Sequence, residues 1–204
     1  MVCGYECGEP KKDQIKYAIK APVIDFDAGC TFANKEKCYG PDARTWRYDN
    51  RVIKWFSLWG HSLNRIDPRG FEKSIVQTNW CNTQAHSMKN VDYRKKLTDP
   101  IQIENFIAHV DYLRPRLILF MGTQLIHALQ HPPVMDRFTA ICGNIVTPLH
   151  PEKKQTKGRN LNVWFQSFYN CQVVGLPHPT GARGLSDDYV ALFRDEIGQL
   201  INHE

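Results

Sequence analysis

The chain has 204 residues, a length that suits one compact domain with a sizeable core and is short for two. Its net charge of +5 and pI near 8.8 are compatible with a polyanionic partner but also with many proteins that bind none. The seven cysteines are an odd number, and neither a signal peptide nor a long apolar run is visible, which argues against a disulfide scaffold or a membrane protein. We therefore expect a reduced, cytoplasmic protein with no membrane contact and no obligate protein partner.

The first part of the chain predicts short strands, two helices and a long connection. In chain order we expect a strand over 1–4, a helix over 10–19, an ordered loop over 21–45, a helix over 50–63 and a strand over 74–78. Val52, Phe56 and Trp59 support the second helix, because their spacing places them on one partly buried face.

The second part of the chain has clearer boundaries. Asp99 can cap a helix, Pro100 suits its first turn, and apolar residues then recur at helical spacing up to Leu113. Next come a strand over 116–120, a helix over 123–130, a mobile basic loop over 151–160, strands over 161–168 and 171–176, and a last helix capped by Ser186. The continuous apolar run of 116–120 is typical of a parallel strand that is covered on both faces.

Alternating strands and helices predict an α/β fold, here a three-layer α/β/α sandwich in which a single domain, residues 1–204, surrounds a largely parallel four-stranded sheet. Functional sites in such sheets gather at the carboxyl ends of the strands. Three predicted strand ends are followed by polar side chains, namely Glu6, Asn79 and His178. The fourth is followed by Gly122, whose turn we expect to be structural. A carboxylate, an amide and an imidazole at one edge outline an active site.

The order of these motifs resembles the uracil-DNA glycosylase superfamily. The resemblance is carried by GYECG at 4–8, an asparagine ending a middle strand, RPRLILFMGTQLI at 114–126 and HPTGARGL at 178–185. In that superfamily the first motif is a glycine-rich turn with Asp, Asn or Glu, and the last is His-Pro-Ser-Pro or a relative. HPTG departs from this last motif at two positions, and residues 21–73 match no part of the pattern.

The resemblance implies a monofunctional DNA glycosylase without cofactor or metal, acting on single- or double-stranded DNA. Glu6 would stabilise the cationic sugar and position water, while a neutral His178, close before a helix N-terminus, would donate to the departing base. Asn79 would pair with a pyrimidine edge, and Phe32 would stack on the flipped base. No lysine lies in an obvious position for a nucleophile, so we expect no strand cleavage through a Schiff base.

Tyr5 and Gly8 belong to the same first motif and are expected to contact the base. In strict uracil enzymes the fifth motif position is a bulky aromatic residue that blocks substituents on pyrimidine C5, whereas this chain has Gly8. The smaller residue is expected to admit a 5-modified pyrimidine as well as uracil. The corresponding role is base repair or defence against modified viral DNA.

The motif around His178 also suggests contacts with DNA. Arg183 can bind phosphate or fill the gap left by a flipped base, and an exposed Leu185 can wedge between bases. Thr180 and Gly181 complete the expected DNA-binding set, with glycine allowing close approach of the backbone.

Simpler structural interpretations remain open for each of these residues. Glu6 can be a solvated turn residue, His178 a hydrogen-bonded loop histidine, Asn79 a helix cap and Phe32 a core aromatic. The spacing of the four cysteines nearest the start, Cys3, Cys7, Cys30 and Cys38, fits neither an iron–sulfur cluster nor a zinc ribbon.

Other functions also remain open. The main alternative is a catalytically inactive nucleic-acid-binding module with the same fold, to which the basic loop over 151–160 could contribute. A hydrolase that pairs Cys142 or Cys171 with His178 is a third reading, but the chain has no nucleophile-elbow motif to support it.

Overall fold

The computed structural model describes residues 1–6, 31–83, 91–156, 158 and 160–202. Contacts within the chain define two compact units. We call Met1–Gly8 with Thr78–Leu185 the sheet unit, and Glu9–Gln77 with Ser186–Glu204 the helical unit. The expected single domain over 1–204 stays a prediction.

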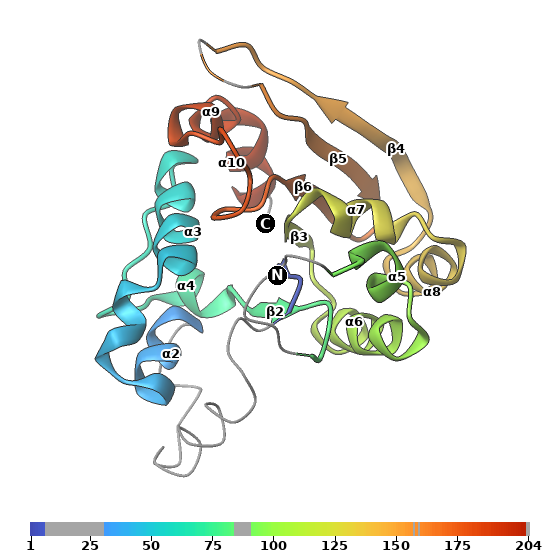
Figure 1. The fold of residues 1–204 in the computed structure, drawn as a ribbon, viewed down its shortest axis with the longest axis horizontal. Helices are drawn as coiled ribbons and strands as arrows, with labels where there is room; N and C mark the ends of the chain where they lie inside the picture. The colour runs from blue at the N-terminus through green and yellow to red at the C-terminus, as the bar shows by residue number, and fades with distance from the viewer. Residues whose placement is uncertain (7–30, 84–90, 157, 159, 203–204) are drawn as a thin grey trace. The chain divides into compact units, whose positions relative to one another are not determined.

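One mixed sheet of six strands organises the fold, in the order β2-β1-β3-β6-β5-β4 (Figure 1). The strands are β1 (Val2–Gly4), β2 (Gln77–Asn79), β3 (Leu117–Met121), β4 (Ile145–Glu152), β5 (Val163–Phe168) and β6 (Gln172–Leu176). Strand β3 runs parallel to both β1 and β6, whereas β5 runs antiparallel to β6 and to β4. The α/β class and the parallel centre are confirmed.

The prediction of a largely parallel, four-stranded sheet is wrong, because the described sheet is mixed and has six strands. The strand predicted over 161–168 is present as β5 but runs antiparallel to its neighbours, and β4 was not predicted. Strand β4 has no buried apolar run: its first four residues are exposed, and it contains Pro148 and Pro151. Proline is tolerated there because β4 lies at the edge of the sheet, where a missing N–H breaks few ladder bonds. The loop predicted for 151–160 therefore begins inside a strand.

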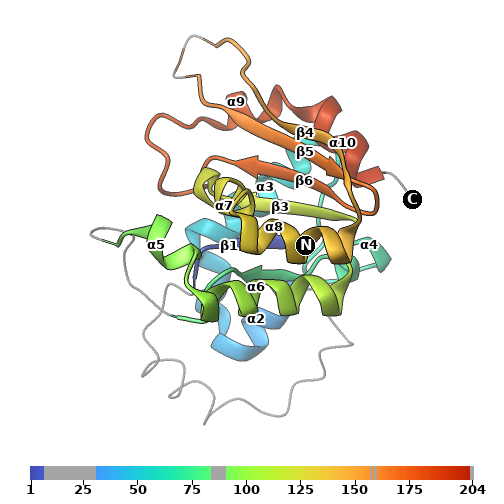
Figure 2. The ribbon, with the colours of Figure 1, turned by 90° about the vertical axis from the view of Figure 1, so that its right-hand side faces the viewer.

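Four helices accompany the strands of the sheet unit: α5 (Tyr93–Leu97), α6 (Pro100–Leu113), α7 (Thr123–Leu129) and α8 (Pro132–Cys142). Figure 2 shows α6, α7 and α8 together in front of the sheet. The predicted cap of α6 is confirmed, because the Asp99 carboxylate accepts a hydrogen bond from the Ile101 N–H at 3.0 Å. The helix ends at Arg114, whose φ of 43° lies in the left-handed region.

The helical unit contains α2 (Thr31–Tyr39), the 3-10 helix η2 (Pro41–Thr45), α3 (Arg47–Leu58), α4 (Gly70–Ser74), α9 (Asp187–Ala191) and α10 (Arg194–Asn202). The loop predicted for 21–45 is wrong from residue 31 onward. The sequence of helix α2 shows no apolar periodicity, because Phe32 is its only buried residue among those whose burial is described. The helix predicted over 10–19 lies outside the described residues.

Three other boundaries differ from the expectation. Helix α3 begins at residue 47 instead of 50 and ends before Gly60, whose φ of 93° stops it. The strand predicted over 74–78 starts only at Gln77, because α4 occupies the residues up to 74. The hydroxyl of Ser186 does accept from the Tyr189 N–H, but the last helix is divided into α9 and α10. Among the described helices, none has the length and apolar character to cross a membrane.

The turn after β3 is structural, as expected, because it accommodates the ring of Tyr5. A β-carbon on Gly122 would lie 2.2 Å from Cε2 of Tyr5. We expect Gly122→Ala to lower the free energy of unfolding by about 1–3 kcal/mol, since the ring must move to make room. Urea denaturation measures this, with Gly70→Ala as the control because no atom lies within 4 Å of its added carbon. Equal losses in both variants would contradict the close packing.

Candidate active site

The carboxyl ends of the three parallel strands meet at one edge of the sheet. Cys3 of β1 pairs with Phe120 of β3, and Met121 of β3 pairs with Leu176 of β6. Glu6 follows the end of β1 by two residues, and His178 follows the end of β6 by two residues. Parallel pairing thus carries both predicted catalytic residues to the same edge of the sheet unit.

Three side chains from the segment after β2 surround the carboxylate of Glu6. Oε2 accepts from Thr83 Oγ1 at 2.7 Å and from Lys96 Nζ, while Oε1 accepts from the Tyr93 hydroxyl. The side chain of Glu6 is only 4% exposed and that of Lys96 is 22% exposed. This is not a solvated turn residue, because the carboxylate is buried and fixed on both oxygens.

Glu6 is held in its ionised form despite this burial. Burial alone raises the pKa of the carboxyl, but the hydrogen bonds from Lys96, Tyr93 and Thr83 and the charge of Lys96 outweigh it, so the pKa lies below the ordinary value. Burial raises the pKa of the Tyr93 hydroxyl, and the contact with Glu6 raises it further, because an ionised tyrosine would repel the carboxylate. The site therefore combines a carboxylate, an ammonium and a neutral phenol.

The turn after β6 fixes the tautomer of His178. Its Nδ1 accepts hydrogen bonds from the backbone N–H of Gly181 at 2.9 Å and of Thr180 at 3.3 Å. An Nδ1 that accepts cannot carry a proton, so the neutral ring carries its proton on Nε2 and donates from there. These contacts support a neutral His178. The amides of the turn favour this form, not the helix N-terminus that the sequence suggested, because helix α9 begins only at Asp187.

Burial lowers the pKa of His178 below its ordinary value, and two amides donating to Nδ1 leave no place for a second proton. We expect ¹⁵N NMR shifts of the imidazole to show the Nε2–H tautomer at neutral pH. The ring is expected to protonate only as the pH falls below the range of an exposed histidine. An exposed-like titration, or the Nδ1–H tautomer, would contradict this hydrogen-bond arrangement.

Tyr5 connects the two predicted catalytic residues. Its ring lies 6.0 Å from the His178 ring and 4.8 Å from the Tyr93 ring, measured between centroids, and Tyr93 donates to Glu6. Tyr5 is buried, and its hydroxyl accepts from the Gln124 N–H at 3.3 Å. Glu6 and His178 thus belong to one packed cluster, in which Tyr5 is a rigid wall.

The structure places Asn79 at the end of β2, the strand next to β1 in the sheet. Its backbone carbonyl accepts from Asn105 Nδ2 at 3.2 Å, which ties this strand end to α6. Asn79 caps none of the described helices, because the next of these, α5, is capped by Asp92. Pairing of its side chain with a base stays a prediction.

The other predicted contacts with base and DNA have different outcomes. Gly8 lies outside the described residues. Phe32 is in helix α2 of the helical unit and is 1% exposed, which favours its interpretation as a core aromatic. Leu185 is also buried, at 8% exposed, so the expectation of an exposed wedge is wrong; a leucine gains free energy by leaving water. Thr180, Gly181 and Arg183 are exposed on the turn that carries His178.

The described cysteines form no metal site. Within the described residues no group of three or more histidine, cysteine, aspartate or glutamate side chains could hold a metal ion. The described free thiols, all buried, are those of Cys3, Cys81, Cys142 and Cys171. Cys7 and Cys30 lie outside the described residues.

The structure excludes a pairing of either proposed thiol with His178. Cys171 directly precedes β6, whereas His178 follows its other end. Cys171 and His178 are seven residues apart, and a strand rises about 3.3 Å per residue, so roughly 20 Å separates them. Cys142 lies near the same end as Cys171, because its carbonyl accepts from the Asn170 N–H at 2.9 Å.

Sequence reasoning missed the three residues that hold Glu6, because no element was predicted between residues 79 and 98. A local signal existed. Asp92 is a good helix cap, and Tyr93 and Leu97 are spaced four apart with basic residues between them, the pattern of a short amphipathic helix. That pattern predicts α5 but not its contact with a residue 90 positions earlier.

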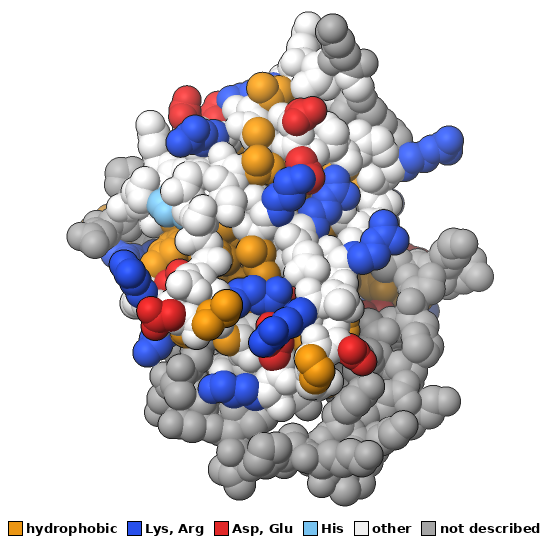
Figure 3. All heavy atoms as spheres, turned by 90° about the vertical axis from the view of Figure 1, so that its left-hand side faces the viewer, with side chains coloured by type: hydrophobic (Ala, Val, Ile, Leu, Met, Phe, Trp, Pro, Cys, Tyr) orange, Lys and Arg blue, Asp and Glu red, His pale blue; other side chains and the backbone are white. Residues whose placement is uncertain are grey.

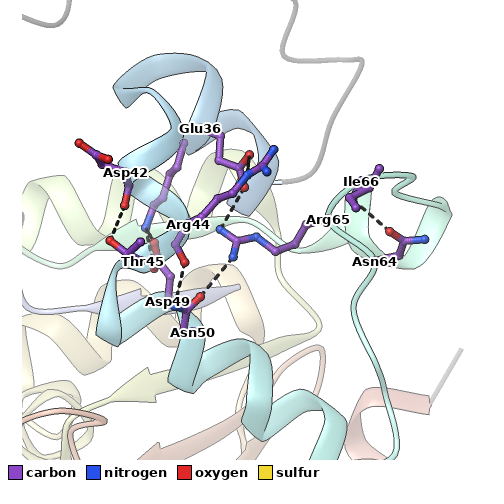
Figure 4. A network of polar contacts seen from close by, with 10 residues as sticks. Glu36, Asp42, Arg44, Thr45, Asp49, Asn50, Asn64, Arg65 and Ile66 are labelled. Atoms are coloured by element: carbon purple, nitrogen blue, oxygen red, sulfur yellow. Dashed lines mark hydrogen bonds and ion pairs between the residues drawn. The ribbon is translucent and has the colours of Figure 1, made fainter.

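A second charged cluster lies in the helical unit, beside a cavity of about 920 Å³. Figure 4 shows the polar contacts of this cluster. Glu36 accepts from Arg44 at 2.5 Å and lies 3.5 Å from Arg65, while Lys35 pairs with the buried Asp49 at 2.8 Å. These charges neutralise one another within the fold. Among the described residues on the face shown in Figure 3, basic side chains are interspersed with acidic and apolar ones.

Among the described residues, the edge of the sheet unit therefore offers the strongest candidate site. It combines a buried, ionised carboxylate with a neutral imidazole of defined tautomer. Tyr93 donates to the carboxylate, and the ring of Tyr5 lies beside the rings of both Tyr93 and His178. No protein-family model matches this chain, and no curated protein matches it.

Proposed function

We propose that the protein is a monofunctional DNA glycosylase that hydrolyses the N-glycosidic bond of a flipped-out uracil or 5-modified pyrimidine. The observation that carries this proposal is the pair of Glu6 and His178 at one edge of the sheet, one ionised and one neutral. Cleavage of this bond creates a cationic sugar and an anionic base, which call for a carboxylate and a neutral donor.

Glu6 suits the sugar side of the reaction. Its negative charge stabilises the oxocarbenium-like transition state, and its buried position strengthens that interaction because little water screens it. A carboxylate has about four lone-pair positions, and Thr83, Tyr93 and Lys96 use three of them. The remaining position can orient the attacking water.

His178 suits the side of the leaving base. The Nε2–H can donate to a pyrimidine oxygen as negative charge develops there, and the amides on Nδ1 hold the ring in that orientation. The exposed Arg183, on the same turn, suits contact with DNA phosphate. This arrangement favours an enzyme in which one turn both positions the donor and contacts DNA.

The monofunctional assignment is part of the proposal. Lys96 lies against Glu6, yet its ammonium is engaged in an ion pair there, and a protonated amine is not a nucleophile. The proposal also includes the three-layer arrangement of the superfamily and action in the cytoplasm. The role of the protein would be base repair or defence against modified viral DNA.

Base release from defined DNA tests the proposed function. Single-stranded and duplex oligonucleotides carrying uracil, a thymine mismatch or a bulky 5-modified cytosine are incubated with the protein and then treated with alkali, which cuts abasic sites. We expect cut strands for at least one modified base, and uncut strands when alkali is omitted. A shifted but intact band with every substrate would favour the alternative, a catalytically inactive nucleic-acid-binding module.

A further inference from the structure

The short helix α5 approaches the end of β1 with two side chains. Tyr93 and Lys96 are three residues apart, hence on the same face of the helix, and each contacts a different oxygen of Glu6. The helix is anchored on both sides of them: Asp92 caps it by accepting from the Lys95 N–H at 3.2 Å, and Leu97 is fully buried. The two donors are therefore presented by a fixed element.

We propose that Lys96 is a positioning residue of this site, whose ion pair with Glu6 fixes the orientation of the carboxylate and keeps it charged. This inference rests on the proposed function and deepens it, because it identifies what controls the carboxylate. Lys96 does not need to touch substrate for this role. It acts through Oε2 of Glu6.

The groups facing Glu6 explain why the lysine matters most. Within the part of the chain that the structure describes, these are Thr83, Tyr93 and Lys96 as donors, together with the nearby thiol of Cys81. Only Lys96 carries a charge near neutrality: burial raises the pKa of Cys81 to about 12, and burial together with Glu6 raises that of Tyr93. Without Lys96, only two neutral hydrogen bonds among the described residues, from Thr83 and Tyr93, would oppose the effect of burial on Glu6.

The direction of the effect on pH dependence follows. The reaction needs ionised Glu6, so base release is lost as the pH falls through the pKa of that carboxyl. Lys96 lowers this pKa, and its removal raises it, which moves the acid limb of the pH–rate profile to higher pH. If base release did not depend on ionised Glu6, removal of Lys96 would leave this limb in place.

The experiment compares Lys96→Met with Lys96→Arg, which keeps the charge, and with Lys95→Met, which removes an exposed charge from the same helix. Single-turnover base release is measured from pH 5 to 9. Relative to wild type, we expect Lys96→Met to lose about tenfold or more at the acid end and much less at pH 9. Lys96→Arg should keep the acid limb at the wild-type pH, and Lys95→Met should keep the whole wild-type profile. Coinciding acid limbs for Lys96→Met and wild type would overturn the proposal.

A ¹³C NMR titration of the Glu6 carboxyl gives a reading that does not depend on activity. The midpoint of the Glu6 titration should shift to higher pH in Lys96→Met and stay in place in Lys95→Met. If the wild type releases no base, the proposed function fails, and this titration alone decides whether Lys96 controls Glu6. Should Lys96→Met not fold, Lys96→Gln replaces it, because it removes the charge but keeps a donor. An unmoved Glu6 titration in the folded neutral variant would refute the role of Lys96.

Discussion

Glu6→Gln is expected to slow base release at least about a hundredfold while DNA binding survives. Electrostatic groups aimed at a transition state typically contribute about 3 kcal/mol, and each 1.4 kcal/mol is tenfold in rate. Glutamine keeps the size of the side chain but removes the charge, and it offers one acceptor oxygen in place of two to Thr83, Tyr93 and Lys96. Single-turnover kinetics at pH 7 to 8 measures the loss.

The matched control is Glu104→Gln, the same chemical change at a carboxylate that is 66% exposed and paired with Arg137 on the surface. We expect it to excise like the wild type, because a surface ion pair contributes little. Thermal unfolding of both variants separates loss of fold from loss of chemistry. Excision by a folded Glu6→Gln protein within a few-fold of wild type would remove Glu6 from the catalytic role.

His178→Ala is expected to give the second large effect, a loss of about a hundredfold in base release, because a preorganised donor to the leaving base disappears. Folding should be affected less, since the side chain lost is only partly buried and its backbone amide partners, Thr180 and Gly181, become exposed to water. The comparison variant His150→Ala, on edge strand β4, should retain activity.

The pH dependence provides a separate check on His178. Its neutral form is the donor, and its pKa is lowered by burial, so the required form is present throughout the neutral range. The wild-type rate should therefore not fall as the pH rises through the ordinary histidine range near about 6.5. A rate that declines there in the wild type, but not in His178→Gln, would mean that the cationic ring is the active form.

Much of the candidate site could be predicted from the sequence. Glu6 and His178 were found as polar residues directly after apolar strands, and parallel pairing of β1, β3 and β6 does bring those ends to one edge. What could not be predicted is the environment of each side chain. The expected exposure of Leu185 was wrong because the burial of a leucine within a turn depends on packing that no local pattern records.

By itself the sequence determined the features that depend on neighbours in the chain. These are the Asp99 cap of α6 and the apolar run of β3. Such features are local because capping and periodicity involve residues only a few positions apart. Tertiary structure alone decided the edge strand β4 and the ionised state of Glu6. The donors to Glu6 lie 77 to 90 residues away in sequence, and a carboxyl's pKa is determined by the charges and burial around it in space.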